Sequence, residues 1–173
     1  LQSRVLVRDA VKDLKLYTEY ELEGRVKNQL IYATQPLSVD LDPVHLDSLD
    51  KELLDVAHIF KLRIHYDGVY YITNINLYAN GKPEQSIWRK FKSLPVVIPT
   101  DYGVLTFTKN LRGEPMDSKR DLFITIASPM QVATSYLSRM TVEPTSKLTS
   151  IAEVTLRDQD VRRAIDFLDQ LAA

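Results

Sequence analysis

The stretch DLFITIASPMQVATSYLSR, residues 121–139, predicts a β-strand that leads directly into an α-helix. Apolar side chains occupy every second position from 122 to 126, which is the period of a strand with one buried face. Ser128 and Pro129 then combine an N-cap residue with a first-turn proline, so a helix is predicted from this point to about Arg139. The core of the protein is therefore expected to contain both a sheet and a helix.

The sequence before this unit is rich in strand signals. Phe60–Tyr66 and Val69–Ile75 both alternate, and Asp67-Gly68 between them is a strong signal for a β-hairpin. Shorter alternating runs predict strands at Leu37–Leu41 and Val104–Thr108.

Two other regions are less regular. Residues 17–32 are interpreted as extended chain with apolar side chains at even positions, including Val26, and with an interruption near Gly24. Residues 79–120 contain four prolines and are interpreted as loops around the single strand at 104–108.

Helices are predicted at both ends of the chain. The first covers about residues 3–15. The last follows a strand at Ile151–Leu156 and a cap at Asp158 or Asp160, and its apolar stripe runs to Ala173 without a stop signal. We expect this helix to continue beyond the chain, which would make the chain a piece of a longer protein.

The order of these elements predicts an α+β fold, namely a mixed β-sheet with helices packed on one side, truncated at the start of a long C-terminal helix. Residues 1–173 are expected to form a single domain. Its core would consist of residues 1–41 and 121–173, and residues 42–120 would form an insertion or a β-rich lobe.

The composition excludes several classes of protein. The chain has 173 residues and no cysteine, which rules out a disulfide framework, a thiolate zinc site and a cysteine nucleophile. Its 22 basic and 23 acidic residues leave none of the basic excess typical of a duplex-binding domain, so no nucleic-acid partner is predicted. Residues 40–58 are strongly acidic, with one basic and six acidic residues, a balance of 1 − 6 = −5.

The five glycines lie at least ten residues apart, at Gly24, Gly68, Gly81, Gly103 and Gly113. Neither of the common glycine-rich phosphate loops can therefore be written anywhere in this chain. No nucleotide or other cofactor is predicted.

The three histidines are His45, His58 and His65. They are the only candidates for nitrogen ligands of zinc or for a base that titrates near neutrality. The carboxylates that could complete a metal site with the first two are Asp47, Asp50 and Asp55. No two histidines have the i, i+4 spacing of a helical metal motif, and the acidic run lacks the central glycine of a calcium loop. This stretch is therefore interpreted as a solvated surface, and no metal is predicted.

The best local cluster of carboxylates consists of Glu143, Glu153, Asp158 and Asp160. Two carboxylates that face each other across a cleft could hydrolyse glycosidic bonds. With 23 acidic residues in the chain such clusters also arise by chance, and the two aspartates are explained as residues of a helix cap and first turn.

Other residue types give weaker signals. Asp101-Tyr102-Gly103 resembles a kinase metal-binding tripeptide but lacks the surrounding motifs and is interpreted as a turn. Ser128 and Ser146 have no histidine in an arrangement that suggests a triad. We therefore assign no catalytic, cofactor-binding or metal-binding residue.

Aromatic side chains could stack on sugars, although tyrosines are also common in strands for reasons of packing alone. The candidates are Tyr66, Tyr70 and Tyr71 at the hairpin and Trp88 beside Arg89, Lys90 and Lys92.

Several segments together resemble a known family. These are Ser128–Ala133, Val142–Ile151, Thr155–Asp160 and Ala164–Leu168, with Leu1–Tyr20 and Leu30–Val39 at the other end. The chain resembles the periplasmic domain of Wzz-type chain-length determinants, the polysaccharide co-polymerases, in the form fused to bacterial tyrosine autokinases of capsule and exopolysaccharide synthesis. The resemblance covers about residues 1–41 and 121–173.

The resemblance implies a periplasmic α+β domain that two transmembrane helices anchor in the bacterial inner membrane. Protomers of this family form a ring-like homo-oligomer, act with a separate polymerase and with the export machinery, and set the length of a polysaccharide. This domain would have no catalytic residues, and any tyrosine kinase activity would belong to a separate cytoplasmic ATP-binding domain.

Two hypotheses from different classes follow. The first is a non-catalytic assembly domain of a polysaccharide co-polymerase. The alternative is a carbohydrate-binding or carbohydrate-acting domain that uses the carboxylates and tyrosines.

Overall fold

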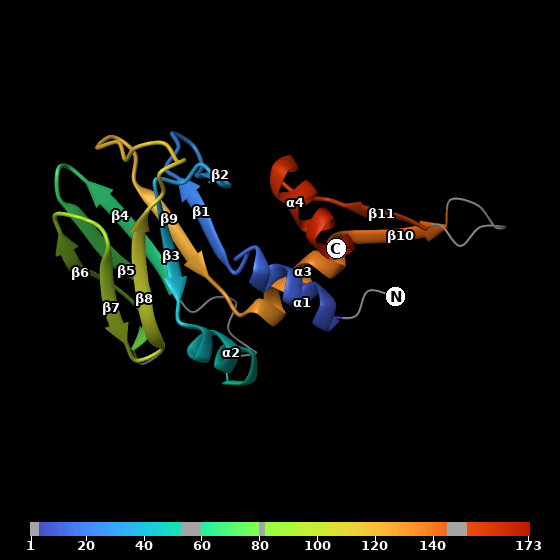
Figure 1. Cartoon of the computed structure of the whole chain (residues 1–173). Coiled ribbons are helices and arrows are strands. Elements are labelled where there is room, and N and C mark those ends of the chain that lie inside the picture. Colours follow the sequence, from blue (N-terminus) through green and yellow to red (C-terminus); the bar gives the residue numbers. More distant parts are fainter. Residues whose placement is uncertain (1–3, 53–59, 80–81, 145–151) are drawn as a thin grey trace.

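The computed structural model describes residues 4–52, 60–79, 82–144 and 152–173, and within these ranges it contains four helices and eleven strands (Figure 1). The helices are α1 (Arg4–Asp13), α2 (Pro43–Glu52), α3 (Pro129–Arg139) and α4 (Val161–Ala172). The strands are β1 (Thr18–Leu22), β2 (Gln29–Ile31), β3 (Leu37–Leu41), β4 (Phe60–Tyr66), β5 (Tyr70–Ala79), β6 (Lys82–Phe91), β7 (Val96–Thr100), β8 (Gly103–Lys109), β9 (Leu122–Ile126), β10 (Met140–Pro144) and β11 (Ala152–Leu156). The predicted α+β class is confirmed.

The largest sheet has six strands in the order β2-β1-β9-β4-β5-β6. Strand β9 lies at its centre, where Ile124 pairs with Tyr20 of β1 on one side and with Leu62 of β4 on the other. The alternation predicted for β9 is confirmed, because its even-numbered side chains are fully buried and its odd-numbered ones are half-buried. The expected mixed sheet is in fact antiparallel in every strand pairing of the described residues.

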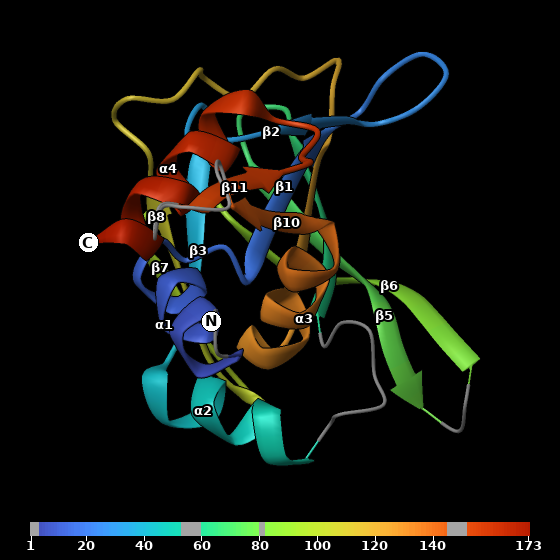
Figure 2. The same cartoon turned by 90° about the vertical axis from the view of Figure 1, so that its right-hand side faces the viewer.

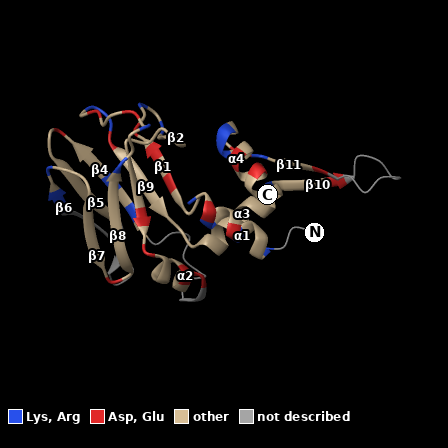
Figure 3. Cartoon of the chain, in the orientation of Figure 1, with Lys and Arg blue, Asp and Glu red and all other residues tan. Residues whose placement is uncertain are grey.

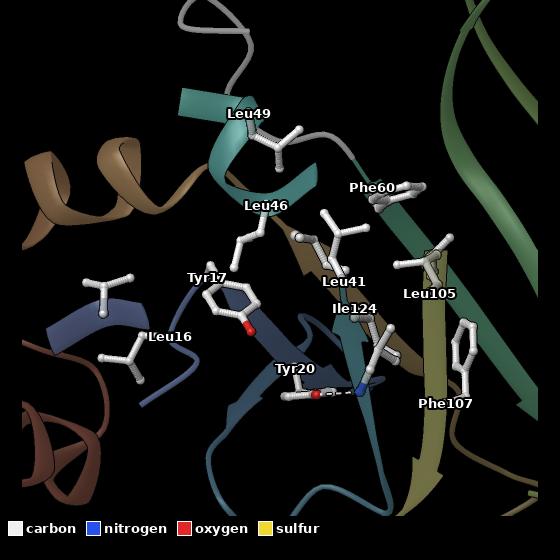
Figure 4. Packing of buried hydrophobic residues seen from close by; sticks show 14 of the residues in the cluster. Leu16, Tyr17, Tyr20, Leu41, Leu46, Leu49, Phe60, Leu105, Phe107 and Ile124 are labelled. Carbon is white, nitrogen blue, oxygen red and sulfur yellow. Dashed lines mark hydrogen bonds between the residues drawn. The ribbon is translucent and has the colours of Figure 1, made fainter. Parts of the chain in front are cut away.

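A second sheet, β3-β8-β7, packs its apolar face against the first and makes the strands a sandwich (Figures 1 and 4). The inner layer of this sheet is formed by Leu37, Val39, Leu41, Ile98, Leu105 and Phe107, all buried. Segment 42–120 contains strands β4 to β8, of which β4 pairs with β9 and β8 pairs with β3, both from the two end segments.

At the free edge of β3, side chains of β1 form the hydrogen bonds that a neighbouring strand would otherwise form. The Val39 N–H donates to the Tyr20 hydroxyl at 2.9 Å, and the Thr18 hydroxyl lies 3.4 Å from the Val39 carbonyl. Burial raises the pKa of Tyr20, so the phenol remains protonated. The two sheets are thus joined here by a buried tyrosine instead of by a backbone ladder (Figure 4).

The helices gather at one side of the sandwich, where α1 packs against α3 and α4 (Figure 2). Helix α1 buries Val7, Ala10 and Val11. It ends in a Schellman-type turn in which the Leu16 N–H donates to the Val11 carbonyl at 2.9 Å and Lys15 takes a positive φ of 56°. None of the helices in the described ranges combines the length and the apolar character needed to cross a membrane.

Two expectations about local structure are wrong, and one helix was not foreseen. Residues 79–120 contain β6 and β7 as well as β8, where only one strand was expected. Pro43–Glu52 of the acidic stretch form helix α2, which begins after an Asp42-Pro43 cap that the sequence analysis did not use. Val26 is 98% exposed at the tip of the β1–β2 loop and does not belong to a buried strand face.

Removal of the Tyr20 hydroxyl should loosen the joint between the two sheets. Tyr20→Phe leaves the buried Val39 N–H without an acceptor, and we expect a loss of about 1–3 kcal/mol in the free energy of unfolding, measured by urea denaturation. Tyr17→Phe is the matched control, because Tyr17 is equally buried but its hydroxyl forms no hydrogen bond among the described residues. Equal losses in the two variants would contradict this role of Tyr20.

Candidate functional site

The acidic stretch holds helices together in the described structure. Asp42 accepts the His45 N–H at 3.1 Å as the cap of α2 and the Val104 N–H at 2.7 Å. Asp50 accepts the Met130 N–H at 2.9 Å and so places a carboxylate at the start of α3. Both residues have structural partners on other elements.

The histidines and aspartates that the sequence offers for a metal site do not come together in the described structure. The His45 ring lies beside Asp42, with 2.7 Å between Nδ1 and Oδ2, and Asp47 forms an ion pair with Lys12 of α1. Asp55 and His58 lie outside the described residues. Within those ranges, no group of three or more histidines and carboxylates is placed to hold a metal ion.

The third histidine belongs to an ion-pair network on the outer face of the large sheet. His65 Nδ1 and Arg63 Nε contact the two oxygens of the buried Asp121, at 2.7 and 2.6 Å. Arg63 also pairs with Glu23 at 3.1 Å. The network ties β1, β4 and β9 together across their register and leaves His65 half-exposed.

The four clustered carboxylates have three different positions in the structure. Glu143 and Glu153 lie opposite each other on the ribbon formed by β10 and β11. Asp160 accepts the Arg163 N–H at 2.9 Å and caps α4, as predicted. Asp158 is not a cap but the fully buried partner of two arginines. A pair of carboxylates facing each other across one cleft is therefore not formed.

A buried ion-pair cluster around Arg163 is the most distinctive polar feature of the described structure. Its guanidinium forms two hydrogen bonds with Asp158, one of them at 2.8 Å from Nε, and a third with Glu19 of β1 at 2.9 Å. Arg139 of α3 contacts the same Asp158 carboxylate at 3.2 Å. The cluster consists of Glu19, Arg139, Asp158 and Arg163, and we call it the Arg163 clamp.

Aromatic rings cover the Arg163 clamp from the helical side. Tyr136 stacks on Phe167 at 4.5 Å between ring centroids, and the Arg139 guanidinium lies 4.5 Å above the Tyr136 ring. Burial raises the pKa of Tyr136 to about 12, although the charges of the neighbouring arginines oppose this shift. Tyr136 is therefore neutral and contributes a ring face and a phenol.

The electrostatics of the Arg163 clamp favour a fixed charge over proton transfer. Burial alone would raise the pKa of Asp158, but the hydrogen bonds and charges of Arg163 and Arg139 outweigh it and hold this pKa below its ordinary value. The pKa of Arg163 is raised by the same partnership. Asp158 consequently stays ionised near neutral pH and has no proton to give to a leaving group.

Three hollows border the Arg163 clamp. One of about 240 Å³ lies between β1 and β3, and its rim includes Lys15 and Asp40, which are 3.1 Å apart. Another, of about 290 Å³, lies between β1, α3 and α4. The third, of about 410 Å³, is lined by all four residues of the Arg163 clamp. Glu19 and Arg163 contribute to all three, so the hollows meet at the Arg163 clamp.

The aromatic residues singled out for sugar stacking lie in packed positions. Tyr66 stacks on Tyr70 at 4.5 Å, and Tyr70 stacks on Phe91 at 5.1 Å. Tyr71 lies beside His65 at 6.2 Å on the outer face. The side chain of Trp88 lies outside the described structure, and the nearby Arg89, Lys90 and Lys92 are exposed.

Two other interpretations are confirmed. Asp101 and Tyr102 form the turn between β7 and β8, with Gly103 at a positive φ of 123°. Ser128 caps α3 by accepting the Gln131 N–H at 3.1 Å. Ser146 lies outside the described residues.

The sequence analysis missed Arg163, Glu19 and Arg139. Glu19 lies 144 positions before Arg163, so local spacing carries no signal for their contact. The one available signal was that Arg163 precedes Phe167 by one helical turn and so shares its buried side.

Breaking the Arg163 clamp should destabilise the fold strongly. Asp158→Asn leaves Arg163 buried without its main counter-ion, and we expect a loss of about 3–5 kcal/mol in the free energy of unfolding at pH 7. The double variant with Arg163→Met should lose less than the sum of the single losses. Arg162→Met, at the exposed neighbouring position, is the control and should cost less than about 0.5 kcal/mol.

The same carboxylate predicts a pH dependence. Because the pKa of Asp158 is lower in the folded chain than its ordinary 3.8, ionised Asp158 stabilises the fold at neutral pH. This stabilisation is lost as the pH falls below about 4 and through the folded-state pKa. Chemical denaturation over this range should show a steeper loss in the wild type than in Asp158→Asn, and parallel curves would contradict the assignment.

Comparison of the chain with known proteins found no match. No model of a protein family matches the chain, and no curated protein matches it.

Proposed function

We propose that this chain is a non-catalytic periplasmic assembly domain of a bacterial inner-membrane polysaccharide co-polymerase, which regulates the chain length and export of a capsular or exopolysaccharide. The proposal starts from the resemblance of residues 1–41 and 121–173 to Wzz-type chain-length determinants. It takes further support from the way the described structure distributes its apolar surface.

The observation that carries the proposal is an exposed apolar stripe on α4. Because Arg163 and Phe167 point into the protein, Val161 and Ile165 point away from it, and Ile165 is 52% exposed. Ala172 is exposed at a compatible spacing. A helix face of this kind is characteristic of a surface that another protein covers.

Two neighbouring elements also carry exposed apolar side chains. Val5 of α1 and Val142 of the β10–β11 ribbon are also exposed, and both elements lie at the helical side with α4 (Figure 1). The ribbon projects from the domain, and a two-stranded ribbon on its own is only marginally stable. Contacts with a second copy would bury the apolar side chains of all three elements.

The Arg163 clamp suits a domain that holds its shape under assembly. It connects α4 and the base of the ribbon to β1 of the sandwich, through the buried pair of Arg163 with Asp158 and the half-exposed carboxylate of Glu19. The alternative, a carbohydrate-acting domain, would use Asp158 as an acid, and the buried, ionised state of this residue favours the assembly role.

Substitution of the α4 stripe in the membrane-embedded protein tests the proposal. Ile165→Asp should reduce the size of the oligomer extracted in detergent and change the modal length of the polysaccharide made in cells, because it places a charge in a buried contact. Val97→Asp is the matched control, because Val97 is 59% exposed on β7 in the other sheet. A monomeric wild type whose deletion left polymer length unchanged would refute the proposal.

A further inference from the structure

Two loops at one end of the sandwich hold apolar side chains out into solvent. Val26 lies between Arg25 and Lys27 in the β1–β2 loop and is 98% exposed, and Leu111 precedes Arg112 in the β8–β9 loop and is 88% exposed. These are the two most exposed large hydrophobic side chains of the described residues. We call residues 23–28 and 110–120 together the loop end.

Both loops are held in defined shapes. A Cβ at Gly24 would lie 2.0 Å from the Lys27 carbonyl oxygen, and a Cβ at Gly113 would lie 2.0 Å from the Gln35 carbonyl oxygen. Only glycine fits either position. The Asn110 side chain also donates to the Gln35 carbonyl at 2.8 Å. The exposed tips are therefore presented by tight turns that leave little entropy to be lost on binding.

The two loops meet at a basic hollow. Arg120 Nε donates to the Glu23 carbonyl at 2.9 Å, and a hollow of about 390 Å³ is lined by Arg25, Lys119 and Arg120 together with Glu23 and Gly24. Within the described ranges, none of these three basic side chains forms an ion pair with a carboxylate.

The one carboxylate in the hollow is held by groups outside it. Glu23 pairs with Arg63 at 3.1 Å, and its other oxygen lies 3.3 Å from the Asp121 N–H. Three basic side chains face this single carboxylate, so the hollow keeps a net positive charge that an anionic group of a partner could balance.

Charge is also distributed unequally along the sandwich. The loop end carries Arg25, Lys27, Arg112, Lys119 and Arg120 against Glu23, Glu114 and Asp117, a balance of 5 − 3 = +2, in a chain whose net charge is −1. Acidic residues of α2 and of the β7–β8 turn lie at the opposite end of the strands (Figure 3). Such a distribution would orient the domain with the loop end toward a negative surface.

We propose that the loop end docks on an anionic phospholipid surface, with a headgroup phosphate in the basic hollow and with Val26 and Leu111 inserted into the interfacial region. Exposed apolar tips flanked by basic residues match the two terms of interfacial binding, apolar burial and attraction to anionic lipid. A soluble polyanion would use the basic residues but would leave the apolar tips in water. The inference goes beyond the proposed function and concerns residues that the α4 substitution does not touch.

Vesicle sedimentation tests this assignment with the 173-residue chain. The chain should bind vesicles of equal parts phosphatidylglycerol and phosphatidylcholine more tightly than pure phosphatidylcholine vesicles, and 0.5 M salt should weaken the binding. Arg25→Gln with Lys119→Gln should reduce the partition coefficient by about twenty-five-fold, from roughly five-fold per basic residue. The double control Lys61→Gln with Arg162→Gln makes the same change of charge elsewhere on the surface.

The apolar tips are tested separately. Val26→Ser with Leu111→Ser should weaken vesicle binding by about ten-fold or more, whereas Val44→Ser with Val97→Ser, at exposed sites outside the loop end, should leave it unchanged. All substituted side chains are exposed, and thermal melts would verify that each variant remains folded. Equal binding to both kinds of vesicle, or loss of binding only in the controls, would overturn the proposal. Binding of soluble polyphosphate that does not depend on Val26 and Leu111, without binding to vesicles, would also overturn it.

Discussion

A buried guanidinium joins the parts of this protein. Arg163 belongs to α4, yet its hydrogen-bond partners are Asp158, which follows the ribbon, and Glu19, in the large sheet. Burial of an unpaired arginine costs several kcal/mol, and the buried Asp158 carboxylate offsets most of this cost, with the half-exposed Glu19 as the second partner. Alternative placements of α4 that separate Arg163 from either carboxylate are therefore disfavoured. The Arg163 clamp fixes the position of the last helix relative to the sandwich in a way that apolar contacts alone would not.

The outward surface of α4 is a consequence of this constraint. A helix whose apolar residues recur at spacings of three and four would normally turn that stripe toward the core. Here Arg163 and Phe167 determine the inward direction, so the Val161–Ile165 part of the stripe is exposed. The buried polar contact and the exposed apolar surface have one cause, and a partner that covers the stripe would act on a helix whose orientation is already set.

The elements governed by local chemistry could be predicted from the sequence. The Asp67-Gly68 hairpin, the Ser128 cap and the strand at 122–126 each depend on residues within a few positions of one another. The division into two sheets could not be predicted, because it depends on which distant strand each strand pairs with. Helix α2 was missed although Asp42-Pro43 is the same kind of signal as Ser128-Pro129, because its acidic residues suggested a solvated surface.

Among the candidate functional residues, too, those with local partners could be predicted and those with distant partners could not. Asp160 could be placed as a cap from its position alone, whereas Asp158, two residues earlier, acquired its role from arginines 5 and 19 positions away. The exposure of Val26 could not be predicted either. Its even position matches the buried positions of the strand before it, but the chain turns at Gly24 and Val26 lies in the loop that follows. The role of Asp158 depends on tertiary contacts, whereas the exposure of Val26 depends on the tight turn between Gly24 and Lys27.

The central strand links the most predictable part of the chain to the least predictable one. Strand β9 lies between β1 and β4, and the ladder continues one step beyond it, where the Glu23 N–H donates to the Asp121 carbonyl at 2.9 Å. This pairing draws the loop that precedes β9 against the loop that follows β1, although the contacting residues Glu23 and Arg120 are 97 positions apart in sequence. The alternation of Leu122, Ile124 and Ile126 thus does more than bury a strand. It assembles a basic surface with exposed apolar tips from two segments, residues 23–28 and 110–120, whose net charges are 2 − 1 = +1 and 3 − 2 = +1.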